Sequence, residues 1–407
     1  MNNPFIIFVS IFSCLLLVGC DSTTTPVESP KISFTNYFED SLWQEGNDVV
    51  QTSDDGYLVL ITERVSEWER NIVLLKTDAF GNRLWRKSST SFAFSSTKIA
   101  QTSDGNFLGL MHGAFPQKSF TSLYLFDPSG NLRSTQPLNG DGSWTYSRDL
   151  IQTNDGGFVV CGEKSSEPTP ASQAIVWKIS PSLQPQWRAL IGDVADLSVA
   201  YSVLQNADGS FLVAGARVPK TVPLFTSFNP FIFKLDSLGN LIWEKHWSGN
   251  ISGTLHSVAP TRDGGFIFAG RSMRSGDQTI GALLLYIDDE GKERWHREYF
   301  TTGLDQALSV VQSGDGGFLV SGMTSISPER MLDALVMKTD RNGRMLWMKS
   351  IGRKYLDWFV SMRKTRDNGF ILTGMSDQDS ISANRDVLLV KIDGNGNPCS
   401  PIIKPRK

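Results

Sequence analysis

The stretch KTDRNGRMLWMKS, residues 338–350, contains no nucleophile beside a base, no metal-ligand spacing and no phosphate-binding loop, yet the chain repeats its pattern. The same succession of Asp, Gly and Trp occurs as KTDAFGNRLWRKS, KLDSLGNLIWEKH and YIDDEGKERWHRE at residues 76–88, 234–246 and 286–298. A pattern that recurs at long, regular intervals is typical of a repeated structural unit rather than of a single site.

A second phrase accompanies the first. It has the form QTxDG, with some variation, followed by an apolar run. Each copy has an aromatic residue near the start of that run. These aromatics are Tyr57, Phe107, Phe158, Phe211, Phe266, Phe318 and Phe370. Successive copies lie 50 to 55 residues apart. The chain therefore contains seven units of nearly constant length.

Each unit reads as two β-hairpins. Asp-Gly or Asn-Gly between alternating apolar runs is a hairpin signal, because Gly and Asn tolerate the positive φ of tight turns. In the sixth unit, residues 307–312 pair with the run after SGDG, and residues 333–339 pair with the run after DRNG. Every unit thus has four short strands, here named a, b, c and d. Such units predict an all-β fold: one seven-bladed β-propeller of four-stranded blades.

The recurring Trp follows the Gly of the c–d turn by four residues. Trp85, Trp243, Trp295 and Trp347 obey this rule, and Trp187 obeys it with Leu183 in the place of Gly. We expect this flat ring to pack against the neighbouring blade. The second unit has Ser134 at the Trp position, so its contact should be weaker.

The seventh unit lacks its fourth strand. After Gly396 the chain continues as NPCSP, and Pro cannot donate to a strand ladder. The Trp usually precedes the next Gln by about 17 residues, and the same count back from Gln51 reaches Phe34. Residues 31–38 should therefore supply strand d of the last blade, which closes the ring and covers a sheet edge.

The Asp-x-x-Gly-x-x-x-Trp phrase resembles the tryptophan-docking motif of quinoprotein-like β-propellers. The whole repeat also resembles the exported seven-repeat propeller lipoproteins of Bacteroidota-like bacteria, over residues 31–397. The resemblance implies the fold and leaves the activity open. The adjacent-cysteine pair typical of quinoprotein dehydrogenases does not occur in this chain, so no cofactor is predicted.

The N-terminus predicts export. Residues 5–18 are an apolar run of a length that suits a signal peptide better than a membrane span. Residues 17–20 (LVGC) resemble a bacterial lipobox, although the preceding MNNP carries no Lys or Arg. We expect a signal peptide at 1–19, a lipidated Cys20 with a flexible tether at 20–30, and a C-terminal tail at 398–407. The alternative is an ordinary signal peptide with an incidental Cys.

Composition narrows the partners. The 407 residues are 40% hydrophobic and 20% charged, with a net charge of -3, which suits a globular body without a nucleic-acid footprint. No His has metal-ligand spacing to another, and the Asp residues of the DGG turns fit turn chemistry, so no metal is predicted. Cys161 lies in an apolar strand and should be a core residue; a disulfide with Cys399 is not expected.

Two sets of candidate site residues follow from the expected fold. The a–b and c–d turns should share one face, the turn face, and the variable b–c and d–a loops the other, the loop face. Loop-face aromatics could form a stacking surface for sugar or peptide, or could fold back as local packing; they are Trp68, Phe115, Trp144, Tyr146, Trp247 and Trp358. Strand a should line the axial channel with Asp48, Lys98 and Asp149, as an ion or substrate site or as a hydrated wall.

These observations favour a non-catalytic envelope or cell-surface lipoprotein that binds or scaffolds through the loop face. We assign no catalytic residue. The expected partners are the membrane, through the lipid, and an envelope protein or a glycan; a monomer is expected. The protein would lie in the periplasm or on the cell surface, with the outer membrane favoured over the inner one. The alternative is an exported polysaccharide-active enzyme on a propeller scaffold.

Overall fold

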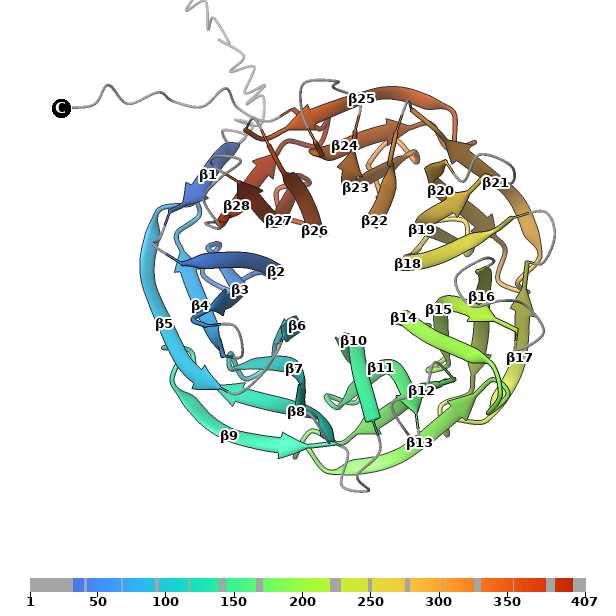
Figure 1. The fold of residues 1–407 in the computed structure, drawn as a ribbon, viewed down its shortest axis with the longest axis horizontal. Coiled ribbons are helices and arrows are strands. Elements are labelled where there is room, and N and C mark those ends of the chain that lie inside the picture. The colour runs from blue at the N-terminus through green and yellow to red at the C-terminus, as the bar shows by residue number, and fades with distance from the viewer. Residues whose placement is uncertain are drawn as a thin grey trace, which may run out of the picture. The chain divides into compact units, whose positions relative to one another are not determined.

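In the residues that the structure describes, 28 strands form seven four-stranded antiparallel sheets, which stand as blades around a ring (Figure 1). The computed structural model describes residues 32–39, 42–66, 69–91, 95–115, 118–138, 144–165, 171–219, 228–247, 251–274, 279–301, 303–325, 331–353, 355–377 and 385–397. The predicted signal peptide, Cys20, the tether, Cys399 and the tail lie outside these residues. Within them, no helix is long and apolar enough to cross a membrane. The predicted seven-bladed propeller is confirmed.

The strands follow the order a, b, c, d in each blade, from the inside of the ring to its outer edge. Blade 1 contains β2 (Trp43–Gln51), β3 (Tyr57–Arg64), β4 (Arg70–Thr77) and β5 (Arg83–Ser91). Blade 2 contains β6 (Ser95–Gln101), β7 (Phe107–Phe115), β8 (Lys118–Phe126) and β9 (Leu132–Pro137). Blade 3 contains β10 (Trp144–Gln152), β11 (Phe158–Ser165), β12 (Gln173–Ile179) and β13 (Pro185–Ile191). Blade 4 contains β14 (Leu197–Gln205), β15 (Phe211–Val218), β16 (Asn229–Leu235) and β17 (Leu241–His246).

The remaining three blades repeat the same order. Blade 5 contains β18 (Gly253–Pro260), β19 (Phe266–Met273), β20 (Ile280–Ile287) and β21 (Glu293–Tyr299). Blade 6 contains β22 (Gln306–Gln312), β23 (Phe318–Thr324), β24 (Asp333–Thr339) and β25 (Met345–Ile351). Blade 7 contains β26 (Asp357–Lys364), β27 (Phe370–Asp377), β28 (Arg385–Ile392) and β1 (Phe34–Phe38).

The core lies between the blades. Strands b and c are apolar on both faces because each face packs against a neighbouring blade: β27, for example, is buried along its whole length. One core cluster joins Cys161 and Val176 of blade 3 with Val213 and Phe231 of blade 4. Cys161 is buried with a free thiol, which confirms it as a core residue. The outer strands are far more exposed, as in β9.

The recurring Trp docks on the Gly of the next blade. The Trp243 ring lies where a Cβ on Gly291 would come within 2.9 Å of it, and Gly291 has a φ of 77°. This position therefore needs Gly for two reasons: the left-handed backbone and the space for the ring. The same contact joins Trp85 to Gly130, Trp187 to Gly239, Trp295 to Gly343 and Trp347 to Gly396.

The Trp also meets the second phrase of the repeat. Its ring lies edge-on or tilted to the aromatic that opens strand b of the next blade, as in Trp187 to Phe211 at 5.8 Å and Trp295 to Phe318 at 5.9 Å between ring centroids. A Lys two residues after the Trp lies over the ring in several blades; Lys349 Nζ lies 4.6 Å from the Trp347 ring centroid. The two recurring phrases thus supply the two sides of one contact between neighbouring blades: the Trp from one blade and the aromatic residue from the next.

The contact between blades 2 and 3 uses a different residue. Ser134 is exposed and provides no ring. Leu183, which takes the place of the docking Gly with a φ of 62°, is 8% exposed and packs in a cluster with Leu108 and Leu110 of blade 2. Where no Trp needs the space, the turn carries a side chain that packs against the preceding blade. The two departures from the repeat therefore belong together.

The ring is closed by the N-terminal strand, as predicted, although β1 begins at Phe34. Figure 1 shows β1 beside β28 at the outer edge. Phe34 pairs with Lys391 in the register in which Trp347 pairs with Lys338. Its ring lies against Gly81, and against Tyr57 at 5.9 Å. Phe34 therefore makes the contact with blade 1 that the docking Trp makes between other blades.

Trp243→Ala should lower the free energy of unfolding by about 2 kcal/mol, less than the roughly 3–5 kcal/mol for a fully buried ring, because Trp243 is half-buried. Ile242→Ala, in the same strand with a 53% exposed side chain, is the matched control and should cost less than about 0.5 kcal/mol. Denaturant unfolding of both variants would measure the difference. Equal losses would mean that the Trp ring does not join the blades.

Candidate functional site

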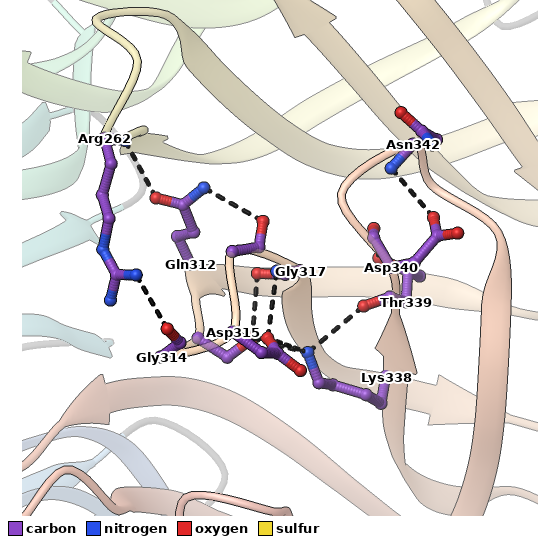
Figure 2. A network of polar contacts seen from close by, with 11 residues as sticks. Arg262, Gln312, Gly314, Asp315, Gly317, Lys338, Thr339, Asp340 and Asn342 are labelled. Atoms are coloured by element: carbon purple, nitrogen blue, oxygen red, sulfur yellow. Dashed lines mark hydrogen bonds and ion pairs between the residues drawn. The ribbon is translucent and has the colours of Figure 1, made fainter.

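The repeated polar residues of the turn face join neighbouring blades. Gln312 accepts a hydrogen bond from the backbone N–H of Arg262 in the preceding blade at 2.9 Å, and Arg262 donates to the carbonyl of Gly314 at 2.7 Å (Figure 2). The same Gln contact occurs in other blades, where the backbone N–H groups of Ser53, Asn154 and Arg366 donate to Gln101, Gln205 and Gln51. The side chain of the repeated Gln therefore forms a hydrogen bond that joins neighbouring blades.

The Asp of each a–b turn also has a structural part. Asp315 accepts hydrogen bonds from Ser313 and the Gly317 N–H, and it pairs with the buried Lys338 at 2.7 Å (Figure 2). Burial works against ionisation of Asp315, but Lys338 and Ser313 outweigh it and lower its pKa to about 2. Equivalent pairs are Lys76 with Asp54, Lys178 with Asp155, Lys234 with Asp208 and Lys391 with Asp367.

The inner ring brings Asp48 together with a residue that the sequence analysis did not select. Asp48 is fully buried; its carboxylate pairs with Arg363 of blade 7 at 2.6 Å and accepts from the Ile99 N–H of blade 2 at 3.0 Å. Burial would raise the pKa of Asp48, but Arg363 and Lys98, with hydrogen bonds from Arg363 and Ser361, hold it below its usual value. Asp48 therefore connects three blades and is not exposed in a channel.

Asp149 connects two blades in the same way. Its carboxylate accepts from the Ser202 hydroxyl and the Val203 N–H of blade 4, both at 3.0 Å. Lys98, between the two acids in the repeat order, is close enough to both Asp48 and Cys161 to influence their pKa values. The three predicted channel residues thus lie together in the inner ring, and the two Asp side chains act as bonds between blades.

The predicted loop-face aromatics have local partners where the structure describes them. Tyr146 lies edge-on to His112 at 5.6 Å. Trp247 donates to Glu293 at 2.5 Å, and Trp358 lies 5.2 Å from the Arg385 guanidinium. Trp68 lies outside the described residues, and the backbone alone is described for Phe115 and Trp144, at the loop-face ends of β7 and β10. The described side chains fit the local-packing alternative better than an open stacking surface.

A feature of strand a that the sequence analysis did not foresee creates the candidate site. Each innermost strand has a β-bulge directly before the inner-ring position, so that one residue per blade has no partner in the ladder. A bulge re-aims a side chain and is common beside binding sites. The bulged residues differ in every blade; they are Asn47, Thr97, Arg148, Tyr201, His256, Leu308 and Val360.

Three of these bulged residues, each near the middle of its strand, lie close together. The Arg148 guanidinium lies 5.5 Å from the Tyr201 ring centroid, and the Tyr201 ring lies 4.8 Å from that of His256. The three come from β10, β14 and β18, which are neighbours in the ring (Figure 1). Beside them is a cavity of about 440 Å³, whose wall includes Arg148 and Tyr201 together with Glu163, Phe228 and Arg271. We call this cavity the blade 3–5 pocket.

Charged groups contribute to the wall of the pocket. Arg148 donates to Glu163 Oε1 at 2.6 Å. Arg271, near the end of β19, lies with its guanidinium 5.7 Å from the Phe228 ring centroid and makes no hydrogen bond or ion pair with a described residue. The remaining wall is mainly apolar and is formed by Leu197, Val199, Met273 and Ile280. Two cations and one carboxylate therefore line the pocket.

Burial is the largest influence on the ionisation of the neighbouring His256 and Tyr201. Burial, followed by Arg271 and Arg148, lowers the pKa of His256 to about 3, so that its ring is neutral at physiological pH. Its Nε2 lies 2.8 Å from the Thr254 hydroxyl. Burial raises the pKa of Tyr201, so its hydroxyl keeps its proton. The pocket is thus suited to hold an anionic group beside neutral hydrogen-bonding partners.

The sequence contained a usable signal for part of this site. Aligning the seven units places Arg148, Tyr201 and His256 at one shared position, directly before the inner-ring residue, and in three consecutive blades. A position that differs in every repeat and is polar in five of the seven is a candidate for recognition. Arg271 carries no such signal, because it follows the Gly at the end of strand b, where other units have varied residues. In the part of the chain described, no three His, Cys, Asp or Glu residues are placed to hold a metal ion.

Comparisons with known proteins support the fold. No family model matches the chain, and no curated protein matches its sequence. Among solved structures it is similar to the polysaccharide lyase Uly1, with a TM-score of 0.56 and 11% identity over 86% of this chain and 90% of that chain. It is also similar to the β-propeller domain of the Trilobed protease from Pyrococcus furiosus, with a TM-score of 0.48 and 10% identity over 92% of this chain and 99% of that chain. At 11% identity, the similarity to Uly1 shows the fold alone.

Proposed function

We propose that this protein is an exported, lipid-anchored binding protein without catalytic activity, and that the loop face with its blade 3–5 pocket is the contact surface. The observation that carries the proposal is the pocket itself. A cavity of about 440 Å³ with an apolar wall and a few converging polar groups is typical of a small-molecule or side-chain binding site. The anchor would be a lipid at Cys20.

The two faces differ in how many of their polar side chains already make hydrogen bonds or ion pairs within the propeller. On the turn face, the Gln and Asp residues of the repeat are engaged in bonds within and between blades, as in Gln312 and Asp315. The blade 3–5 pocket reaches the loop face, since its wall includes Leu197 and Ile280 at the loop-face ends of β14 and β20. The bulged residues beside it differ from blade to blade, and Arg271 makes no hydrogen bond or ion pair with a described residue. A rigid ring that presents variable groups on one face is the usual arrangement of a recognition scaffold.

The place of β1 supports the same choice of face. Phe34 and Asn36 contact Gly81, in the c–d turn of blade 1, and Asn36 donates to its carbonyl at 2.7 Å. The chain therefore enters the ring at the turn face and runs along β1 toward the loop face. The first described residues of the propeller therefore lie at the turn face and not at the proposed contact surface.

The test is capture of envelope components by the full-length protein extracted from its native membrane, together with a glycan array. Tyr201→Ala, in the pocket wall, should weaken capture by about 10-fold or more, since aromatic residues dominate such contacts. Leu238→Ala, with a 71% exposed side chain in a c–d turn, is the turn-face control and should leave capture unchanged.

The outcomes separate the possible functions. A stoichiometric protein partner would make the protein a scaffold, and a glycan that is bound but left intact would make it a glycan-binding protein; both support the proposal. Cleavage of a bound glycan would overturn it in favour of the alternative, an exported polysaccharide-active enzyme. Capture that depends on Leu238 and not on Tyr201 would also overturn it.

A further inference from the structure

We infer that the blade 3–5 pocket recognises an acidic sugar, with the sugar carboxylate bound by Arg271. This inference rests on the proposed function and names the class of ligand for the same site. It follows from three kinds of group that line one cavity: a guanidinium that makes no hydrogen bond or ion pair with a described residue, polar groups with an atom that makes no hydrogen bond to a described residue, and an apolar wall.

The guanidinium of Arg271 selects the carboxylate. Arg148 is already paired with Glu163 at 2.6 Å, whereas Arg271 makes no ion pair with any residue that the structure describes. Its contact with the Phe228 ring at 5.7 Å holds the guanidinium over an aromatic face without using its hydrogen-bond donors. A planar guanidinium matches a carboxylate in a bidentate pair. A phosphate would be matched less well, because among the described lining residues Arg271 is the one cation without a described counter-ion.

The remaining polar groups of the pocket wall favour a ligand that carries hydroxyl groups. The Oε2 atom of Glu163 and the hydroxyl of Tyr201 make no hydrogen bond to a described residue, yet both residues line the pocket. Glu163 can accept a hydrogen bond and Tyr201, which stays protonated, can donate or accept one. A ligand that leaves such groups unpaired loses affinity, so a hydroxyl-bearing ligand is favoured over a purely apolar acid.

The apolar wall suits the carbon-bound face of a sugar ring. Leu197, Val199, Met273 and Ile280 line the same cavity as the polar groups. A ring with hydroxyls at its edge and C–H groups on its face would satisfy both kinds of group at once. A peptide C-terminus offers the same carboxylate, but it brings amide groups for which the apolar wall has no partners.

The experiment measures binding of four probes to the full-length protein by calorimetry: a hexuronic acid oligosaccharide, its methyl ester, the neutral hexose oligosaccharide, and a short peptide with a free C-terminal carboxylate. The acidic oligosaccharide should bind at least about 10-fold more tightly than its ester, which keeps the shape and removes the charge. Arg271→Gln should reduce that affinity by about 10- to 100-fold, and Arg271→Lys by less, because Lys keeps the charge and loses the planar fork.

Arg188→Gln is the matched control, since Arg188 is an exposed residue of the outer strand β13 and its loss changes the net charge equally. It should leave binding unchanged. Equal binding of the acidic and neutral oligosaccharides would overturn this inference while leaving the proposed function in place. Binding of the peptide alone would also overturn it. If no glycan and no envelope component binds, the proposed function itself fails.

Discussion

Deletion of residues 32–38 should abolish the cooperative unfolding of the propeller. The deletion removes β1, the fourth strand of blade 7, and with it the ladder from Phe34–Phe38 to β28. It leaves β28 as an unpaired sheet edge, which favours aggregation, and it opens the contact between Phe34 and Gly81 that closes the ring. We expect the truncated protein to lose most of its soluble monomer in size-exclusion chromatography and its sharp thermal transition in circular dichroism.

The control is deletion of residues 21–30, which precede β1 and lie outside the described residues. This variant should unfold like the intact protein, within about 2 °C. Two point substitutions sharpen the test. Phe34→Ala should cost about 2 kcal/mol because the ring is half-buried. Phe34→Trp restores the residue that most other blades use and should be neutral or stabilising. Unchanged stability of the 32–38 deletion would show that the ring is not closed by this strand.

Asp48→Ala should lower the free energy of unfolding by about 3 kcal/mol. The substitution leaves the Ile99 N–H without its acceptor and removes the partner of Arg363. The Arg363 side chain is 38% exposed, so water can partly replace the carboxylate, which limits the loss. Asp48→Ser introduces the residue found at the same position in four other blades and should cost less than Asp48→Ala. Chemical denaturation would measure all variants.

Ser257→Ala is the matched control, since Ser257 occupies the inner-ring position of blade 5 and accepts one backbone N–H, from Val310 at 3.3 Å. It should cost about 1 kcal/mol or less. Equal losses for Ser257→Ala and Asp48→Ala would contradict the three-blade role of Asp48.

The contribution of Asp48 to the free energy of unfolding should also depend on pH. Because the folded state holds the pKa of Asp48 below its usual value, its stabilising contribution is present above about pH 4 and is lost as the pH falls through the folded pKa. The difference in stability between the intact protein and Asp48→Ala should therefore be full at pH 7 and should shrink toward pH 3.

Most of the fold could be predicted from the repeat. Seven copies of two phrases predict seven blades, and the missing strand after Gly396 together with Phe34 predicts how the ring closes. The prediction succeeds because a repeated contact needs the same residues at the same places in every blade: the Trp ring and the Gly that makes room for it. The sequence shows that Ser134 of blade 2 and Leu183 of blade 3 depart from the repeat. It does not show that Leu183 packs against blade 2, where Ser134 provides no ring.

The candidate site was predicted much less well. The sequence marked Asp48, Lys98 and Asp149 as one cluster, and the structure places them together in the inner ring. The partner of Asp48, however, is Arg363, which is 315 residues away along the chain. Nothing in the repeat requires an arginine there, since the other blades do not share it. The loop-face aromatics were chosen for their residue type alone, and those that are described have local partners.

By itself, the sequence determined the number of blades, their four-strand make-up and the closure by the N-terminal strand, because these depend on residues that recur at a fixed period. Only the tertiary structure decided which variable side chains meet. Arg148, Tyr201 and His256 come together because a β-bulge in each inner strand re-aims one residue and because blades 3, 4 and 5 are neighbours in the ring. Arg271 joins them from a different strand of the blade, β19. Contacts between residues that do not repeat leave no period in the sequence, so the pocket became visible only once the ring was built.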